Sequence, residues 1–109
     1  MDSFVINGIN WSLVFVNGSN EALRRSDGVY TLGTTDLRTK TVYISSVLTG
    51  RLLYKVICHE LCHCFCFSYG IYLDLRTEEL IADFLATYGQ EVFAIADDIF
   101  SRFLLTDAY

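Results

Sequence analysis

Two histidines and a glutamate in the middle of the chain form the pattern His-Glu-x-x-His. The sequence contains two histidines in all, His59 and His63, and Glu60 follows the first of them. Positions four apart on a helix lie on one face, one turn above the other. Two imidazoles placed in this way can bind one metal ion, and the intervening glutamate can reach a water at that ion without being a ligand. The pattern therefore predicts a zinc site, Zn2+, in which Glu60 is the catalytic general base.

The residues around this motif favour a buried helix. Apolar side chains dominate residues 52–58 and 65–67, and the segment lacks proline. Its glycines, Gly50 and Gly70, lie at its two ends, where they favour a start and a stop. We predict one helix over about residues 49–69. The alternative, in which the histidines only satisfy hydrogen bonds in a core, does not account for two of them at this spacing with a glutamate between.

All of the cysteines fall within the same predicted helix, at Cys58, Cys62, Cys64 and Cys66. Cysteines four residues apart on a helix rarely have the geometry for a disulfide. We therefore predict reduced thiols, packed as small hydrophobic side chains in an intracellular protein. Cys66 lies seven residues after His59 and shares the histidine face, so lining the metal pocket or binding the metal is an alternative role for it.

The composition indicates a single folded domain over residues 1–109. Apolar residues make up 52% of the chain, which excludes a disordered class. No apolar run is long enough to cross a bilayer, and the first residues show no secretory signal, so we expect a cytoplasmic protein without a membrane partner. The net charge is −5 and the basic residues are scattered, which argues against a nucleic-acid partner.

Strands are predicted in the first part of the chain, residues 1–46. The β-branched and aromatic runs that suggest them are separated by turn signals such as Asn7-Gly8. Residues 21–26 fit either a short helix or an irregular loop. The four expected strands are Phe4–Ile6, Trp11–Val16, Val29–Gly33 and Thr41–Ile44, the last as an edge strand or hairpin partner.

A helical region is predicted over about residues 77–105. Thr77 is a plausible helix cap, with two glutamates in the first turn, and apolar residues then recur at helical spacing. Gly89 interrupts this pattern, and we expect it to kink the helix or to split it into a pair. Strands followed by helices favour an α+β domain.

The third metal ligand must be a carboxylate or a thiolate, because the chain has no third histidine. Glu78 and Glu79 are the candidates, since a helix hairpin would bring the start of the second helix near the end of the first. We choose Glu79, because Asp83 lies four residues later on the same face and can accept the outer N–H of a zinc-bound histidine. Glu78 is then assigned to the positive end of the helix.

Together, His59-Glu60-Leu61-Cys62-His63 and the stretch that begins at Glu79 resemble the gluzincin metallopeptidases. Within that group they are most similar to the small ImmA/IrrE-like peptidases common in phages and mobile elements. The resemblance covers about residues 29–90 and implies a minimal zincin-like metalloprotease domain, with a small antiparallel or mixed sheet followed by a motif helix and a C-terminal helix or helix pair. It also implies that the strand before the motif helix binds the substrate as an added strand, here through Thr41, Val42, Tyr43 and Ile44.

The expected function is therefore zinc-dependent hydrolysis of peptide bonds in an intracellular peptide or protein substrate. The alternative is a zincin fold that keeps the metal but acts as a sensor or as a protein-interaction module. Glu60 favours the enzyme, because a purely structural site has no use for a general base beside a ligand.

Overall fold

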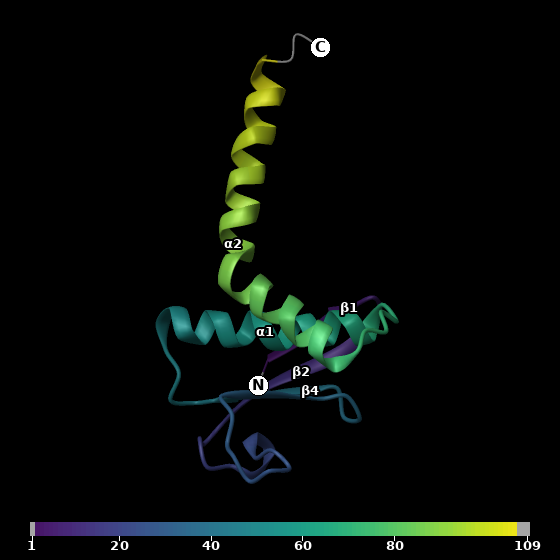
Figure 1. The fold of residues 1–109 in the computed structure, drawn as a ribbon, viewed down its shortest axis with the longest axis vertical. Coiled ribbons are helices and arrows are strands. Elements are labelled where there is room, and N and C mark those ends of the chain that lie inside the picture. The colour runs from purple at the N-terminus through teal and green to yellow at the C-terminus, as the bar shows by residue number, and fades with distance from the viewer. Residues whose placement is uncertain (1, 107–109) are drawn as a thin grey trace.

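The computed structural model describes residues 2–106, and its strands precede its helices, which confirms the α+β class (Figure 1). Within these residues, no helix combines the length and the apolar character that crossing a bilayer requires. The elements are β1 (Asp2–Ile6), β2 (Ile9–Val16), the short 3-10 helix η1 (Glu21–Leu23), β3 (Gly33–Asp36), β4 (Thr41–Ser45), α1 (Gly50–Ser68) and α2 (Leu75–Thr106).

The strands of residues 2–106 form one mixed sheet in the order β1-β2-β4-β3. β1 and β2 are an antiparallel hairpin, closed by Asn7 and Gly8 with φ angles of 49° and 78°, as a two-residue primed turn requires. β4 pairs in parallel with β2 and antiparallel with β3. The expectation that Thr41–Ile44 offers an edge to a substrate is therefore wrong, because both sides of β4 are already hydrogen-bonded. Next to β4, β3 is the outer strand, and β1 is the outer strand at the opposite side of the sheet.

The position of β3 also corrects the predicted strand at Val29–Gly33. The strand begins where that prediction ends, at Gly33, and runs through Asp36. Thr34 and Thr35 pair with β4, whereas the apolar stretch before them contributes an isolated bridge from Tyr30. A β-branched threonine suits a pleated surface that is half covered. Residues 33–36 therefore form the strand because they pair with β4, although residues 29–32 are more hydrophobic.

The core lies between one face of the sheet and α1. Two side chains of β2, one of them Trp11, and two of β4 point to this face and are buried against Cys64 of α1. The Trp11 indole N–H donates a 2.9 Å hydrogen bond to Ser68 Oγ, which ties β2 to the last turn of α1. The buried cluster consists of Ile6, Trp11, Leu13, Val42, Ile44, Leu48 and Cys64.

Helix α1 ends with the backbone pattern that a glycine stop predicts. Gly70 has a φ of 65°, and the N–H of Ile71 donates to the carbonyl of Cys66 at 2.8 Å. The N–H of Gly70 bonds to Phe67 O, so the last free carbonyls are satisfied in a Schellman arrangement. This closure fixes where the chain turns back toward α2, and hence which residues of α2 face the histidines.

Helix α2 begins earlier than predicted and does not split, although Figure 1 shows that it bends away from α1 partway along its length. Asp74, and not Thr77, caps it, since the Asp74 carboxylate accepts from both the N–H and the hydroxyl of Thr77 at 2.9 Å. The helix continues through Gly89. A Cβ at that glycine would lie 2.9 Å from Leu85 Cδ1, so the missing side chain makes room for Leu85 one turn earlier.

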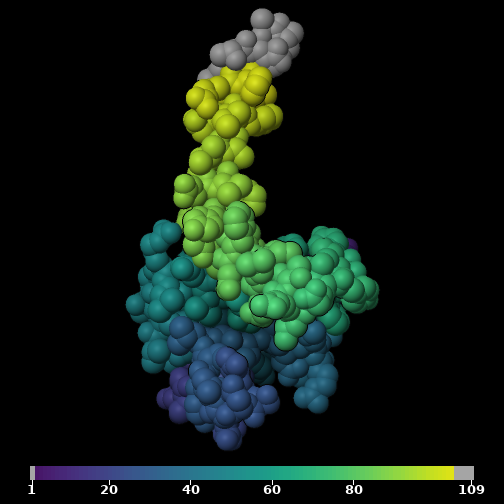
Figure 2. All heavy atoms as spheres, in the orientation of Figure 1, coloured from purple at the N-terminus to yellow at the C-terminus, as the bar shows by residue number. Residues whose placement is uncertain are grey.

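The far half of α2 extends beyond the rest of the molecule. Figure 1 shows α2 lying along α1 at its start and then standing away from it, and Figure 2 shows this segment clear of the other atoms. We call residues 92–104 the arm. On one side it carries an apolar face in which each side chain is between 42% and 65% exposed. This face consists of Val92, Phe93, Ile95, Ile99, Phe100, Phe103 and Leu104.

Candidate metal centre

Small side chains bring the two helices together where the site forms. Cys62 and Cys66 of α1 pack against Ala82 of α2, which is 0% exposed, and Leu85 covers this cluster. The distance between packed helices depends on the side chains at the contact, so residues of this size favour a close approach. The carboxylates of the first turns of α2 can therefore reach the histidines of α1.

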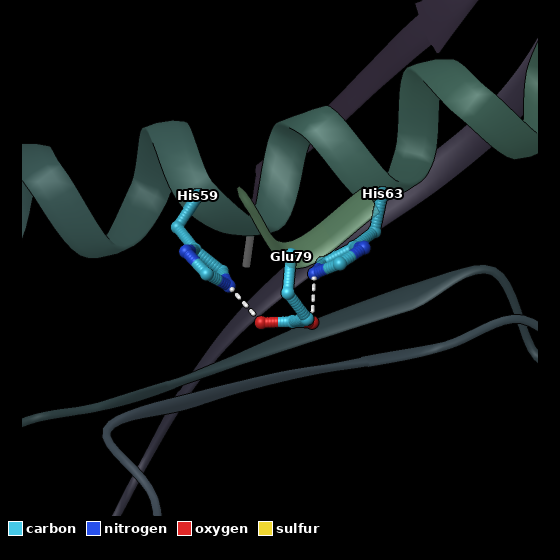
Figure 3. Close-up of side chains that lie close together, drawn as sticks. All are labelled: His59, His63 and Glu79. Atoms are coloured by element: carbon cyan, nitrogen blue, oxygen red, sulfur yellow. Dashed lines mark hydrogen bonds and ion pairs between the residues drawn. The ribbon is translucent and has the colours of Figure 1, made fainter. Parts of the chain in front are cut away.

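The two imidazoles converge on one carboxylate, as Figure 3 shows. His59 Nε2 lies 3.1 Å from Glu79 Oε2, and His63 Nε2 lies 2.9 Å from Glu79 Oε1. One potential ligand atom from each of the three residues lies within 4.8 Å of the others. His59, His63 and Glu79 are thus brought together as predicted, and they could hold a metal ion.

The outer nitrogen of each imidazole faces a second carboxylate. His59 Nδ1 lies 2.9 Å from Asp83 Oδ1, the contact that the spacing of Glu79 and Asp83 led us to expect. His63 Nδ1 forms a short contact with Glu78 Oε2. The assignment of Glu78 to the helix end alone was therefore wrong, because Glu78 orients the second histidine as Asp83 orients the first. Both contacts direct an Nε2 atom toward Glu79.

The chemistry of this donor set fits a divalent cation. Two histidines and one glutamate are the protein ligands of one class of catalytic zinc sites, which leave a further position open. Four carboxylates, from Glu60, Glu78, Glu79 and Asp83, surround the two imidazoles. A cation at the point of convergence would offset their mutual repulsion.

Glu60 lies on the side of α1 that faces the sheet, beside the histidines. Its side chain is buried, at 7% exposure, and its Oε1 accepts a 2.7 Å hydrogen bond from Thr35 Oγ1 on β3. Burial raises the pKa of Glu60 above its ordinary value, while the Thr35 hydrogen bond and the neighbouring imidazoles act in the opposite direction. The hydroxyl fixes one carboxylate oxygen and leaves Oε2 for another partner.

Gly33 sets the spacing between β3 and α1 next to this carboxylate. A Cβ at Gly33 would lie 2.8 Å from Val56 Cγ1 and 3.2 Å from Glu60 Cγ. The first distance is shorter than real Cβ contacts allow, so a side chain at this position would force Val56 or the backbone around it to shift. The absence of a side chain thus allows Thr35 to reach Glu60.

A cleft of about 880 Å3 opens onto the three candidate ligands. Residues 31–35 form one wall, α1 forms the floor with Glu60 and both histidines, and α2 forms the other wall. Cys66 is not among the lining residues and packs instead in the contact between the helices. Its predicted alternative role in the pocket therefore finds no support in the described residues.

The cysteines have the environment of inert packing residues. All four are free thiols, and three of them are buried. Burial raises the pKa of Cys62 to about 11 and that of Cys64 to about 12, and it also raises the pKa of Cys66. These thiols are protonated near neutral pH, whereas a thiolate is the form that binds metal or reacts.

Comparisons with protein-family models, with curated proteins and with solved structures gave no match, so the geometry of the site carries the functional argument. One contributor to the site, Thr35, was not predicted from the sequence, and another, Glu78, was given a different role. Thr35 lies in a polar stretch without a motif, and only the packing of β3 on α1 brings it to Glu60. Glu78 was considered as a third ligand beside Glu79 and then assigned to the helix end, whereas the structure places it against His63 Nδ1.

Proposed function

We propose that this chain is a zinc-dependent peptidase with a minimal zincin-like fold of the ImmA/IrrE-like kind. The observation that carries the proposal is the convergence of His59, His63 and Glu79 on one point, with a buried Glu60 beside them. The contacts of Glu78 and Asp83 with the outer imidazole nitrogens support it, because catalytic zinc sites hold their histidines in this way.

Zinc at this point would supply a Lewis acid for the scissile carbonyl and lower the pKa of a water toward about 7. Glu60 acts on the attacking water as general base. Its Oε2 takes one proton as the water oxygen bonds to the carbonyl carbon, and it gives that proton to the leaving amine as the C–N bond breaks. Thr35 keeps the carboxylate in the orientation that this transfer needs, because it holds Oε1.

The substrate backbone lies along β3 in this proposal. Within the described residues β3 pairs with β4 alone, so its other edge is free to hydrogen-bond an added strand beside the candidate ligands. Main-chain pairing of this kind is a common mode of peptide recognition. It also requires an extended, unstructured segment as the substrate, since a folded segment does not present its backbone.

The test compares Glu60→Gln with the wild type on an unstructured protein such as casein. Both proteins are expected to bind zinc stoichiometrically, and the variant is expected to lose about 10²–10⁴-fold in cleavage rate. Glu21→Gln, an exposed site on η1, is the matched control and should cleave at the wild-type rate. Equal activity of Glu60→Gln and wild type would remove Glu60 from the mechanism.

A protein that binds zinc tightly but cleaves no unstructured substrate would favour the alternative of a metal-dependent sensor or interaction module. A protein purified without chelator that contains no metal, and that does not take up zinc in titration, would exclude both proposals. The two measurements together therefore separate an enzyme, a non-catalytic metal protein and an accidental motif.

A further inference from the structure

The apolar side chains of the arm are exposed in the part of the chain that the structure describes. The apolar face of residues 92–104 spans about half of the helix circumference, since its members recur at spacings of one, three and four residues. Globular proteins bury such a face, and a helix of this length is only marginally stable in water by itself. Within residues 2–106 no other element covers it, because α2 leaves α1 before the arm begins.

The charges of the arm exclude two kinds of partner. The polar side carries Glu91, Asp97 and Asp98, and Arg102 is the single basic residue of positions 91–104 in the sequence. Helices that lie on a membrane surface are rich in lysine and arginine on this side, because the lipid headgroups are anionic. A nucleic acid would likewise be repelled by the acids.

A second copy of this chain matches the face in chemistry and in size. An uncharged apolar face is complementary to itself, and the acidic side points away from the contact. The three phenylalanines of this face alone expose roughly 380 Å2 per copy, taking about 200 Å2 for each. Those of two copies would contribute about 760 Å2, and the four aliphatic side chains beside them bring the contact toward the roughly 1,200 Å2 at the lower end of stable interfaces.

The shape of the molecule favours an antiparallel pair. The molecule measures 58 × 30 × 28 Å, and the axes of packed helices lie about 8–10 Å apart. We call the part of the chain before the arm, residues 2–91, the body. In a parallel pair of arms, the bodies of the two copies would occupy the same space. Antiparallel arms put the bodies at opposite ends. The tip of each arm then meets Phe84 and Tyr88 of the other copy, which are 57% and 52% exposed and continue the line of Val92 into the body.

We propose that two copies of this chain associate through their arms as an antiparallel helix pair. The proposal is independent of the peptidase activity, because no residue of the arm lines the cleft. The test is sedimentation velocity of the full chain at micromolar concentrations, with the expected mass twice the 12.4 kDa of one chain.

The deciding variant is Ile95→Asp with Ile99→Asp, which places two charges in the apolar face and is expected to give single chains at every concentration. The matched control is Ala94→Asp with Ser101→Asp, which adds the same charge on the polar side and should leave the dimer intact. Circular dichroism checks that the helix content is retained. If the Asp variant loses helix content, the double variant Ile95→Ala with Ile99→Ala replaces it as the test. We expect it to raise the dimer dissociation constant by about 100-fold.

Three results would overturn the proposal. The wild type remains a single chain at all concentrations, the variants in the apolar face pair as tightly as the wild type, or the assembly has a mass other than that of two chains. The first and third outcomes would assign the apolar face to another protein or to a larger assembly. The second would assign the pairing to another surface.

Discussion

The two halves of α2 both carry many apolar residues, but their surroundings differ. Residues 75–90 lie against α1, where Ala82 is fully buried and the acids of the first turns contact two histidines. Residues 92–104 have no buried side chain. In the first half tertiary contacts fix the side chains that face α1, whereas in the second half little more than helix propensity acts within the single chain. One continuous helix thus serves the proposed metal centre at one end and the proposed association at the other.

The largest effect that we expect in the first half comes from Glu79→Ala. Losing one of three protein ligands should weaken zinc binding by about 10³-fold or more in a competition titration with a chromophoric chelator. Zinc should also raise the melting temperature of the wild type and not that of the variant, because an ion stabilises only the state that binds it. Arg76→Ala, three residues earlier and outside the candidate ligands, is the control. Similar affinities for Glu79→Ala and Arg76→Ala would show that Glu79 is not a ligand.

The next largest effect on zinc affinity concerns Glu78 and Asp83, the two carboxylates that orient the histidines. Glu78→Gln and Asp83→Asn should each weaken zinc binding by about 10–100-fold, because they hold the histidines and do not bind the metal. The Glu78 side chain is 20% exposed and that of Asp83 is 70% exposed. Solvent screens the exposed contact more strongly, so we expect Glu78→Gln at the upper end of this range and Asp83→Asn at the lower end. The reverse order would show that exposure does not decide between them.

The smallest effect concerns the arm. Ile95→Asp with Ile99→Asp should leave zinc affinity within about twofold of the wild-type value, since distant sites without shared partners act independently. The same titration as for Glu79→Ala measures it, at a concentration where the wild type is dimeric. A change as large as that of Glu78→Gln would mean that the two halves of α2 are coupled, and the contrast between them would no longer hold.

Local patterns in the sequence were enough to predict some of the fold. The glycine stop of α1 at Gly70 depends on neighbours alone, and so does the hairpin turn at Asn7-Gly8. β3 could not be placed in this way. Its threonines are polar and short, and they form a strand because β4 offers them an edge. In the same sheet β4 lies between β2 and β3, and no pattern within Thr41–Ile44 indicates this central position.

The candidate site could likewise be predicted from the sequence only in part. The spacing of His59 and His63 places them on one helical face, and the spacing of Glu79 and Asp83 does the same on α2, so periodicity alone predicts both pairs. Which carboxylate meets which imidazole depends on how far α2 is rotated about its axis, and that is set by the packing of Ala82 on Cys62 and Cys66. For this reason Glu78 was assigned to the wrong role, while Thr35 was given no role in the site.

Gly33 has a consequence for the proposed chemistry. A methyl group there would meet Val56 Cγ1 and Glu60 Cγ, so it would shift the proposed general base without replacing any acid, base or ligand. In the proposed mechanism, a single added carbon atom would then separate metal binding from proton transfer, because the three candidate ligands lie outside this contact.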